Sequence, residues 1–429
     1  MLEQTRATII LSILFALGLS VHASAQSPAS PEVEFQGLFY VDEADIRARC
    51  QIEDNRAYSQ ADIFSMDQCL RRSGLFARHT LEQRGNDLII SVAEMESRPG
   101  KVEFGVFYNT TEDLIGNFYA ERYNLVNGFS ARGEITYSSQ RVLSDGEIYR
   151  QSLFGNNVGL GFRTGFEKTQ LNDQRFDTKR SQLELFVRYD SFDRMQLDFG
   201  AGVRALEVDN IRSGASSIIQ SDLGSEDRPY VRLGLKYQLP PTDVLETFET
   251  RVDGYLWNIG ANRLYELQAS LGSKFALGSS PYSLLVNADA GAVFAQGDAA
   301  TRIVDRFFLS PNQLRGFAAR GIGPRDGSQF LGGNRYAAAR IELQRDFSDA
   351  FETPFTAGVF ANIGSVWGLE ESLITGTTVD DKARWRSSVG ITVSATFGVI
   401  PISIYLAAPI QRVSGDETQT FGINISTRF

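Results

Sequence analysis

The final nine residues alternate strictly between apolar and polar positions. The apolar positions are Phe421, Ile423, Ile425, Thr427 and Phe429, and the polar ones are Gly422, Asn424, Ser426 and Arg428. Because successive side chains of a β-strand point to opposite faces, one face of this segment is apolar and the other is polar. Nine residues are also about the length of a tilted strand that crosses a bilayer. The pattern therefore predicts a membrane-spanning strand.

The same alternation recurs between residues 98 and 429. The predicted strands are residues 101–109, 115–124, 129–140, 147–155, 157–168, 180–190, 195–208, 228–239, 249–258, 262–276, 282–295, 335–347, 355–368, 383–396, 400–409 and 418–429. The number is even, which places both ends of a barrel on one side of the membrane. A soluble β-sandwich would also alternate, but one connection here, 296–334, is far longer than the others. We therefore predict a 16-stranded antiparallel transmembrane β-barrel over residues 98–429.

Composition limits the possible chemistry. The net charge is −10, which disfavours a nucleic-acid partner because such partners bind basic surfaces. Only two histidines occur, His22 and His79, so a mechanism that needs two of them is nearly excluded. We predict no catalytic residues, no metal site and no cofactor. An enzyme, such as a barrel lipase or protease, would lack a visible set of catalytic groups.

The N-terminus has the pattern of an export signal. An apolar run covers residues 7–21, and the small residues of Ala23-Ser24-Ala25 follow it. This pattern predicts a signal peptide over residues 1–25 and a mature chain that starts at Gln26. The alternative is a membrane anchor, for which an apolar run of this length is short.

A small α+β domain is predicted over residues 33–96. A strand over 33–41 precedes a helix that Asp42 caps, and Ser65 begins a second helix over 66–73. Residues 75–83 and 88–93 form a hairpin, which gives the order β-α-α-β-β. Cys50 and Cys69 lie near the two helices, and an exported location favours a disulfide between them. The alternative is two buried free thiols.

Motifs in both parts of the chain resemble one family. The steps Gly74-Leu75-Phe76 and Leu88-Ile89-Ile90-Ser91-Val92-Ala93-Glu94 resemble the end of a POTRA domain. The long connection contains Leu314-Arg315-Gly316-Phe317, then Gly323-Pro324, then Gly332-Gly333-Asn334. In this order the motifs are similar to those of the BamA/TamA outer-membrane assembly superfamily. The resemblance covers nearly the whole mature chain.

The resemblance implies that the long connection is the sixth extracellular loop and folds back into the barrel lumen. Gly316 lets the loop turn tightly, and Arg315 then needs a bidentate partner inside the barrel. Strand parity offers Glu342, on the inward face of its strand. The family usually places a second acidic residue where this chain has Asn362, which can accept one hydrogen bond from Arg315. The alternative is a loop that only plugs a pore.

The resemblance also implies a function. It predicts an insertase or translocase in the outer membrane of a diderm bacterium, with the POTRA-like domain in the periplasm. Its partners would be unfolded outer-membrane protein clients, of β-barrel or autotransporter type, and the lipid bilayer. Clients would enter through a seam between strands 1 and 16, and Phe421, Ile423, Ile425 and Phe429 would form a C-terminal assembly signal.

A single POTRA-like domain favours a TamA-like accessory factor, with an inner-membrane protein as a further candidate partner. Two alternatives are a transporter of the two-partner-secretion type, from the same superfamily, and a passive porin.

Overall fold

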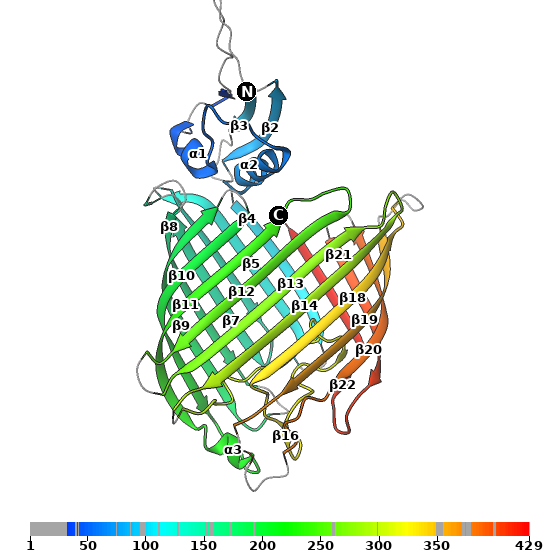
Figure 1. Cartoon of the computed structure of the whole chain (residues 1–429). Helices are drawn as coiled ribbons and strands as arrows, with labels where there is room; N and C mark the ends of the chain where they lie inside the picture. The colour runs from blue at the N-terminus through cyan, green and yellow to red at the C-terminus, as the bar shows by residue number, and fades with distance from the viewer. Residues whose placement is uncertain are drawn as a thin grey trace, which may run out of the picture.

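A computed structural model describes residues 32–428 with short internal gaps. The gaps are residues 39–40, 42, 74, 86, 95–99, 110–111, 127, 151–152, 155–157, 171–173, 192–193, 260–261, 298, 349–354, 371–373, 375–378 and 398–399. The predicted signal peptide, the predicted cap Asp42 and the terminal Phe429 lie outside the described residues. Two parts are visible: a small N-terminal domain and a barrel below it (Figure 1).

The N-terminal domain has the predicted β-α-α-β-β order. Its elements are β1 (Val33–Gln36), α1 (Glu43–Cys50), α2 (Gln60–Ser73), β2 (Phe76–Arg84) and β3 (Asp87–Glu94). The sheet has the order β1-β3-β2, in which β1 runs parallel to the central strand β3 and β2 runs antiparallel to it. Ile46, Met66, Leu70 and Ile90 are fully buried between the helices and the sheet.

The second helix begins earlier than its predicted start at Ser65. The helix starts at Gln60, and Ser59 caps it. Oγ of Ser59 accepts from the N–H of Asp62 (3.2 Å). Oδ2 of Asp62 in turn accepts from the N–H of Ser59 (2.8 Å). This reciprocal pair is a capping box, although Asp takes the place of the more usual Glu or Gln. The start was predicted wrongly because Ser65 has the residue type of a cap but lies inside the helix.

A disulfide joins the two helices. Cys50, the last residue of α1, is bonded to Cys69 of α2, with 5.6 Å between the Cα atoms. The next residue, Gln51, has a left-handed backbone (φ +54°), and its Nε2 donates to the carbonyl of Asp190 on the barrel (2.8 Å). The disulfide therefore lies beside the contact between the N-terminal domain and the barrel rim.

Sixteen antiparallel strands form one closed barrel, as predicted. They are β4 (Gly100–Asn109), β5 (Asp113–Val126), β6 (Phe129–Tyr137), β7 (Arg141–Arg150), β8 (Val158–Thr169), β9 (Asp177–Ser191), β10 (Met195–Asp209), β11 (Gly224–Leu239), β12 (Leu245–Trp257), β13 (Leu264–Ala276), β14 (Tyr282–Ala295), β18 (Arg335–Asp346), β19 (Phe355–Trp367), β20 (Arg386–Phe397), β21 (Ile400–Gln411) and β23 (Phe421–Arg428). The barrel closes where β23 pairs with β4. We call the end beside the N-terminal domain the proximal end and the opposite end the distal end.

The largest error in the predicted strands concerns the fourth. It was predicted over 147–155 but runs over Arg141–Arg150. The turn before it is short: Ser138 N donates to the carbonyl of Arg141 (2.8 Å), and Ser138 Oγ accepts from the N–H of Arg141 (2.9 Å). Polar residues at 144–147 have the appearance of a turn in the sequence, but several of them face the lumen, where polar side chains belong.

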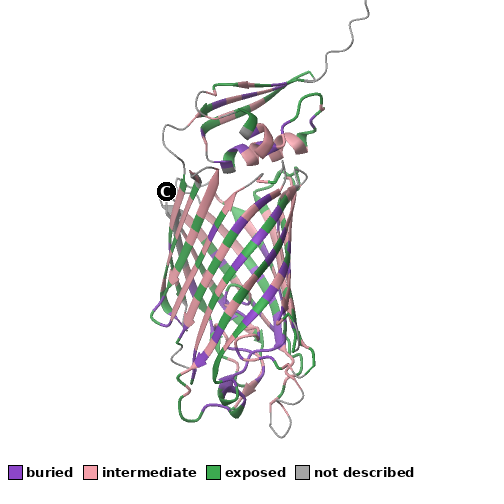
Figure 2. Ribbon diagram, turned by 90° about the vertical axis from the view of Figure 1, so that its left-hand side faces the viewer, coloured by how far each residue is buried: buried purple, intermediate pink, exposed green. Residues whose placement is uncertain are grey.

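Side-chain burial follows the predicted alternation (Figure 2). On β9, Leu183 and Leu185 are 49% and 56% exposed, whereas the intervening Glu184 is 1% exposed. The apolar side chains thus point outward, to lipid, and the polar ones point into the lumen. Within the described residues, no helix is long and apolar enough to cross a membrane.

The disulfide generates a first prediction. Replacing both cysteines by Ser (Cys50→Ser with Cys69→Ser) should lower the free energy of unfolding of the N-terminal domain by about 3 kcal/mol, because the unfolded chain then loses its cross-link. Urea-dependent proteolysis of that domain in the full chain would measure this. Barrel unfolding serves as the internal control and should not change. An unchanged midpoint for the N-terminal domain would contradict the prediction.

Candidate functional site

The connection between β14 and β18 is folded into the distal half of the barrel. It contains three two-residue strands, β15 (Gly316–Phe317), β16 (Arg325–Asp326) and β17 (Gln329–Phe330). We call residues 296–334 the lumen loop. The loop packs in two apolar layers, an outer one near the distal end and an inner one against the barrel wall.

The outer layer joins the lumen loop to the connection between β10 and β11. Ile303 and Leu331 of the loop pack with Ile218 and Ile219 of the short helix α3 (Ser217–Gln220). The N–H of Ile303 also donates to Oδ2 of Asp222 (2.7 Å). Burial raises the pKa of Asp222. This layer covers the distal end of the lumen.

The inner layer lies beside the predicted motif. Leu309, Leu314, Phe317 and Ile322 of the loop are buried against the inner face of the barrel wall. Their partners on the wall are Tyr336, Ala338 and Val366, from β18 and β19. Phe317, the last residue of the predicted Leu-Arg-Gly-Phe motif, is 1% exposed. The motif is therefore packed against the wall and is not a free tip.

Arg315 reaches three adjacent strands. Its Nη2 lies 2.7 Å from Oε2 of Glu342 on β18, and its Nη1 donates to Oγ1 of Thr392 on β20 (3.0 Å). Between them, the ring of Phe360 on β19 lies 3.6 Å from the guanidinium carbon. The side chains of Arg315 and Glu342 are 14% and 8% exposed, so water screens this pair little. The arrangement attaches the loop to the wall through charge, hydrogen bonding and a cation–π contact.

Two glycines of the motif lie where a side chain would not fit. Gly316 has φ +99°, and a Cβ there would approach Cβ of Ser388 to 2.9 Å; Oγ of Ser388 donates to the carbonyl of Arg315. Gly323 has φ +113°, and a Cβ would lie 3.1 Å from Cβ of Val366. The carbonyl of Pro324 then accepts from the N–H of Leu331 (2.8 Å), which closes the loop on itself. Close approach to the wall requires glycine at both positions.

Asn362 contacts the main chain of Arg315 and not its guanidinium. With its carboxamide oriented so that both ends are satisfied, Oδ1 accepts from the N–H of Arg315 (3.2 Å) and Nδ2 donates to the carbonyl of Ala361 (3.2 Å). The sequence predicts that Asn362 accepts one hydrogen bond from Arg315 as a neutral partner of its side chain, whereas in the structure the donor is the main-chain N–H of Arg315. The sequence also missed Thr392 and Phe360 as partners of Arg315. Strand parity would have placed Phe360 on the inward face with Asn362, and Thr392 on the inward face between Ile391 and Val393, but parity could not place either of them beside Arg315.

The lumen loop is also bonded to the segment before the last strand. β15 pairs with β22 (Thr418–Gln419), which aligns Gly316 with Gln419. The N–H of Ala318 donates to the carbonyl of Glu417 (3.0 Å), and the N–H of Glu417 donates to the carbonyl of Gly321 (2.9 Å). β23 begins two residues after β22. The residues beside Arg315 are therefore connected directly to the strand that closes the barrel.

The closing strand has the shortest pairings in the barrel. Among the described residues, β23 pairs five residues with β21 and six with β4, whereas the other barrel junctions pair eight to fifteen. The seam with β4 runs from Ile423 opposite Tyr108 to Arg428 opposite Glu103. Separating β23 from either neighbour, the seam with β4 included, would therefore leave fewer backbone groups unpaired than separating any other pair of wall strands among the described residues.

The residues of the predicted C-terminal signal lie along this strand. Phe421 is 36% exposed on the outer face, and Gly422 beside it is buried. Ile423 is aligned with Tyr108, and Ile425 with Val106. Phe429, as noted above, lies outside the described residues, so the assembly signal stays a prediction.

The wall opposite the seam holds an ion network that the sequence did not suggest. Arg232 on β11, whose side chain is 1% exposed, contacts Glu184 (3.0 Å), Asp198 (3.0 Å) and Asp253 (2.7 Å). Arg163 and Arg188 extend the network to Glu147 on β7. Each residue could be assigned to the lumen by parity, but its partners depend on the register between strands. In the described part of the chain, no group of three or more His, Cys, Asp or Glu is arranged to hold a metal ion.

Comparisons with known proteins agree with this architecture. The Omp85 superfamily domain matches residues 98–429. The chain is 25% identical over 406 residues to the outer membrane protein assembly factor BamA of Neorickettsia risticii (strain Illinois), which covers 90% of this chain and 53% of that protein. The chain thus spans about half the length of this curated relative. It is also 34% identical over 89 residues to the human sorting and assembly machinery component 50 homolog, over 18% of each chain.

Solved structures share the fold. BamA from Haemophilus ducreyi lacking POTRA domains 1–3 matches with a TM-score of 0.69 and 17% identity, over 93% of this chain and 84% of that chain. CdiB from Escherichia coli matches with a TM-score of 0.61 and 12% identity, over 93% and 76%. At these identities the likeness concerns the fold alone.

The geometry around Arg315 generates a second prediction. The barrel should be destabilised by each of three changes, Arg315→Lys, Arg315→Ala and Glu342→Gln, because one buried charge or hydrogen-bonding group then loses its partner. For the full truncation, Arg315→Ala, the loss of stability should be about 3–5 kcal/mol. The loss would appear as a lower temperature at which the unboiled protein changes its mobility on a gel. The double variant Arg315→Ala with Glu342→Gln should cost less than the sum of the two single changes.

Arg384→Lys provides the control, because Arg384 pairs with Asp380 where both side chains are about half exposed. Exposed pairs contribute about 0–1 kcal/mol, so its effect should be small. Full heat resistance of Arg315→Lys would show that the loop is held by apolar packing alone.

Proposed function

The chain belongs to the Omp85 superfamily, and we propose that it is an insertase or translocase that assists the assembly or secretion of outer-membrane clients through the β4–β23 seam. It is an outer-membrane protein whose N-terminal domain lies in the periplasm, so the proximal end faces the periplasm and the distal end faces outward. The observation that carries the proposal is the connection from Arg315, through β15 and β22, to the strand that closes the barrel.

The mechanism follows from backbone hydrogen bonding in lipid. A strand edge in the bilayer core has no water to pair with, so an open seam is costly unless another strand occupies it. β4 and β23 share fewer residue pairs than any described junction that does not involve β23, so their separation costs less than separation of the wall away from β23. A client strand that pairs with the exposed edge replaces the lost hydrogen bonds. In this way the barrel templates a strand without any chemical step.

The lumen loop would control how readily the seam opens. While Arg315 holds the loop against β18 and β20, β22 is fixed, and β23 starts at a defined position. Release of the loop would free β22 and thereby the distal end of β23. Gln419 reinforces this connection, since its Nε2 donates to the carbonyl of Phe421, the first residue of β23 (2.9 Å).

The clients, by this proposal, are unfolded β-barrel or autotransporter-type proteins. The name of the Neorickettsia relative, an outer membrane protein assembly factor, supports this class of client. The TamA-like accessory subclass and an inner-membrane companion stay predictions. A neighbouring gene that encodes an inner-membrane protein would support both of them. A two-partner-secretion transporter is the second candidate, favoured by the fold shared with CdiB; a secreted β-helical protein encoded beside this chain would support that candidate instead.

A covalent seam tests the proposal. The variant Tyr108→Cys with Ile423→Cys places two cysteines directly opposite each other across the seam. Oxidation should block the insertion of a client barrel into liposomes that contain the protein, and reduction should restore it. The matched control is Leu183→Cys with Val203→Cys, which lie opposite each other on two lipid-facing wall strands. Insertion that continues at the normal rate with the seam oxidised would refute the lateral route.

A conductance measurement separates this function from that of a passive porin. The packed lumen loop argues against a wide open pore, so single-channel conductance in planar bilayers should be small and intermittent. Arg315→Ala should raise the open fraction, because the loop then loses its attachment to β18 and β20. Arg384→Lys again provides the control. A steady, large conductance in the unmodified protein without client insertion would favour the porin.

A further inference from the structure

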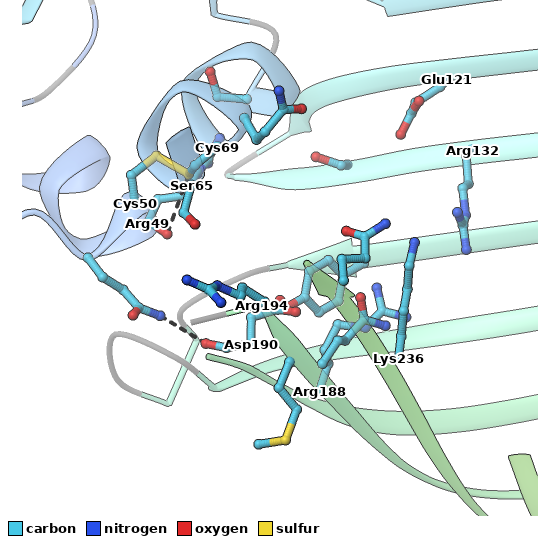
Figure 3. Close-up of a pocket in the computed structure, with 18 of the residues that line it drawn as sticks. Arg49, Cys50, Ser65, Cys69, Glu121, Arg132, Arg188, Asp190, Arg194 and Lys236 are labelled. Carbon is cyan, nitrogen blue, oxygen red and sulfur yellow. Dashed lines mark hydrogen bonds between the residues drawn. A yellow bond between two sulfur atoms is a disulfide. The ribbon is translucent and has the colours of Figure 1, made fainter. Parts of the chain in front are cut away.

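A cavity of about 540 Å³ lies between the N-terminal domain and the proximal end of the barrel. Its roof is made by α1 and α2 around the Cys50–Cys69 disulfide, and its floor by the proximal parts of β5, β6, β7, β9, β10 and β11 (Figure 3). We call it the vestibule. It opens beside the lumen, on the side from which periplasmic molecules would reach the barrel.

The lining of the vestibule is mostly polar and more basic than acidic. Five basic side chains line it against three acidic ones, although the whole chain carries a net charge of −10. The basic residues are Arg49, Arg132, Arg188, Arg194 and Lys236, and the acidic ones are Glu121, Glu147 and Asp190. Apolar cavities suit most small organic ligands. This cavity instead suits a polar ligand with negative charge.

Most of these charges are already engaged. Glu147 pairs with Arg132 (3.0 Å) and Arg188 (3.3 Å), and Lys236 pairs with Glu249 of β12 (3.2 Å). The carboxylate of Asp190 accepts from the hydroxyl of Tyr149 (3.1 Å), and that of Glu121 accepts from the hydroxyl of Tyr119 (2.9 Å). These groups hold one another in place and shape the floor.

Arg194 differs from them. The structure shows no ion pair or hydrogen bond between its side chain and any residue that it describes. Its backbone has φ +92°, a left-handed conformation that costs a non-glycine residue free energy and that Gly, Asn or Asp would adopt more easily. Strained backbone conformations cluster at active sites and ligand-binding positions, and here such a backbone presents a guanidinium that pairs with none of the described residues to a cavity. Figure 3 shows Arg194 between the disulfide-bonded helices and the barrel rim.

The roof is held over Arg194 by the contact described above. The disulfide fixes the end of α1, and Gln51 donates to the carbonyl of Asp190, four residues before Arg194. Phe64 of α2 and Tyr119 and Tyr149 of the floor add apolar surface beside the polar groups. Mixed aromatic, hydroxyl and guanidinium groups match the alternating chemistry of an extended polypeptide better than that of a free inorganic anion.

We propose that the vestibule binds an extended polypeptide segment with acidic side chains, and that Arg194 receives one of its carboxylates. A guanidinium can bind a carboxylate through two parallel hydrogen bonds, which the cavity leaves free to form. The identification of the segment as part of a client rests on the proposed function. The vestibule would then hold the client before it reaches the seam.

Peptide binding to the full chain in detergent micelles tests the site. One ten-residue probe alternates Thr with Asp, a second alternates Thr with Asn, and both carry an uncharged fluorophore for anisotropy. The acidic probe should bind about tenfold more tightly than the neutral one, and its binding should weaken as salt is raised. Arg194→Glu should weaken binding of the acidic probe by about tenfold or more. Arg194→Lys, which keeps the charge, should lose less.

Arg78→Glu is the matched control. Arg78 is exposed on β2, does not line the vestibule, and its replacement changes the net charge by the same amount as Arg194→Glu. Equal effects of the two reversals, or equal binding of the two probes, would overturn the site. Client insertion is measured separately with the same proteins. If the unmodified protein binds the acidic peptide selectively but inserts no client, the binding site is supported and the proposed function is refuted. If it inserts clients but does not bind the acidic peptide selectively, the proposed function is supported and the binding site is refuted.

Discussion

The absence of water in the bilayer core is the constraint on which this structure depends. Every backbone N–H and C=O in the membrane must find a partner in the protein, so a sheet there has to close. The chain meets this requirement with sixteen strands, and the closure occurs between β4 and β23. That junction and its neighbour, β21–β23, contain the fewest residue pairs among the described junctions. The requirement for closure is thus satisfied least strongly on the two sides of β23.

Interactions inside the lumen reinforce this asymmetry. The network around Arg232 joins five consecutive strands, β8 to β12, on the wall away from the seam, and Glu147 extends it to β7. Removing one member would leave a buried charge without its partner, so this wall resists deformation. On the other side, Arg315 fixes a loop whose neighbouring residues pair with the segment before β23. The barrel therefore combines a wall held by ion pairs with a closure that depends on one loop.

The N-terminal domain lies beside the proximal end of the barrel, apart from the seam. Its disulfide and Gln51 place α1 and α2 over the proximal end of the barrel, where they roof the vestibule. Arg194 and its basic neighbours line this cavity. Recognition at the entrance and strand exchange at the seam would then be separate events, each governed by different residues of the same chain.

Sequence alone determined the properties that depend on local periodicity. Alternation identified all sixteen strands and which side chains face lipid, and parity placed Glu342 inward, where it meets Arg315. Other features depend on register and on the path of a long loop, which no local pattern encodes. Only the tertiary structure decided that Asn362 bonds the main chain of Arg315, that Thr392 and Phe360 complete its surroundings, and that β22 connects the loop to β23. The partners of Arg232, and the lack of a partner for Arg194 among the described residues, were decided in the same way, because contacts between distant strands arise only when the barrel closes.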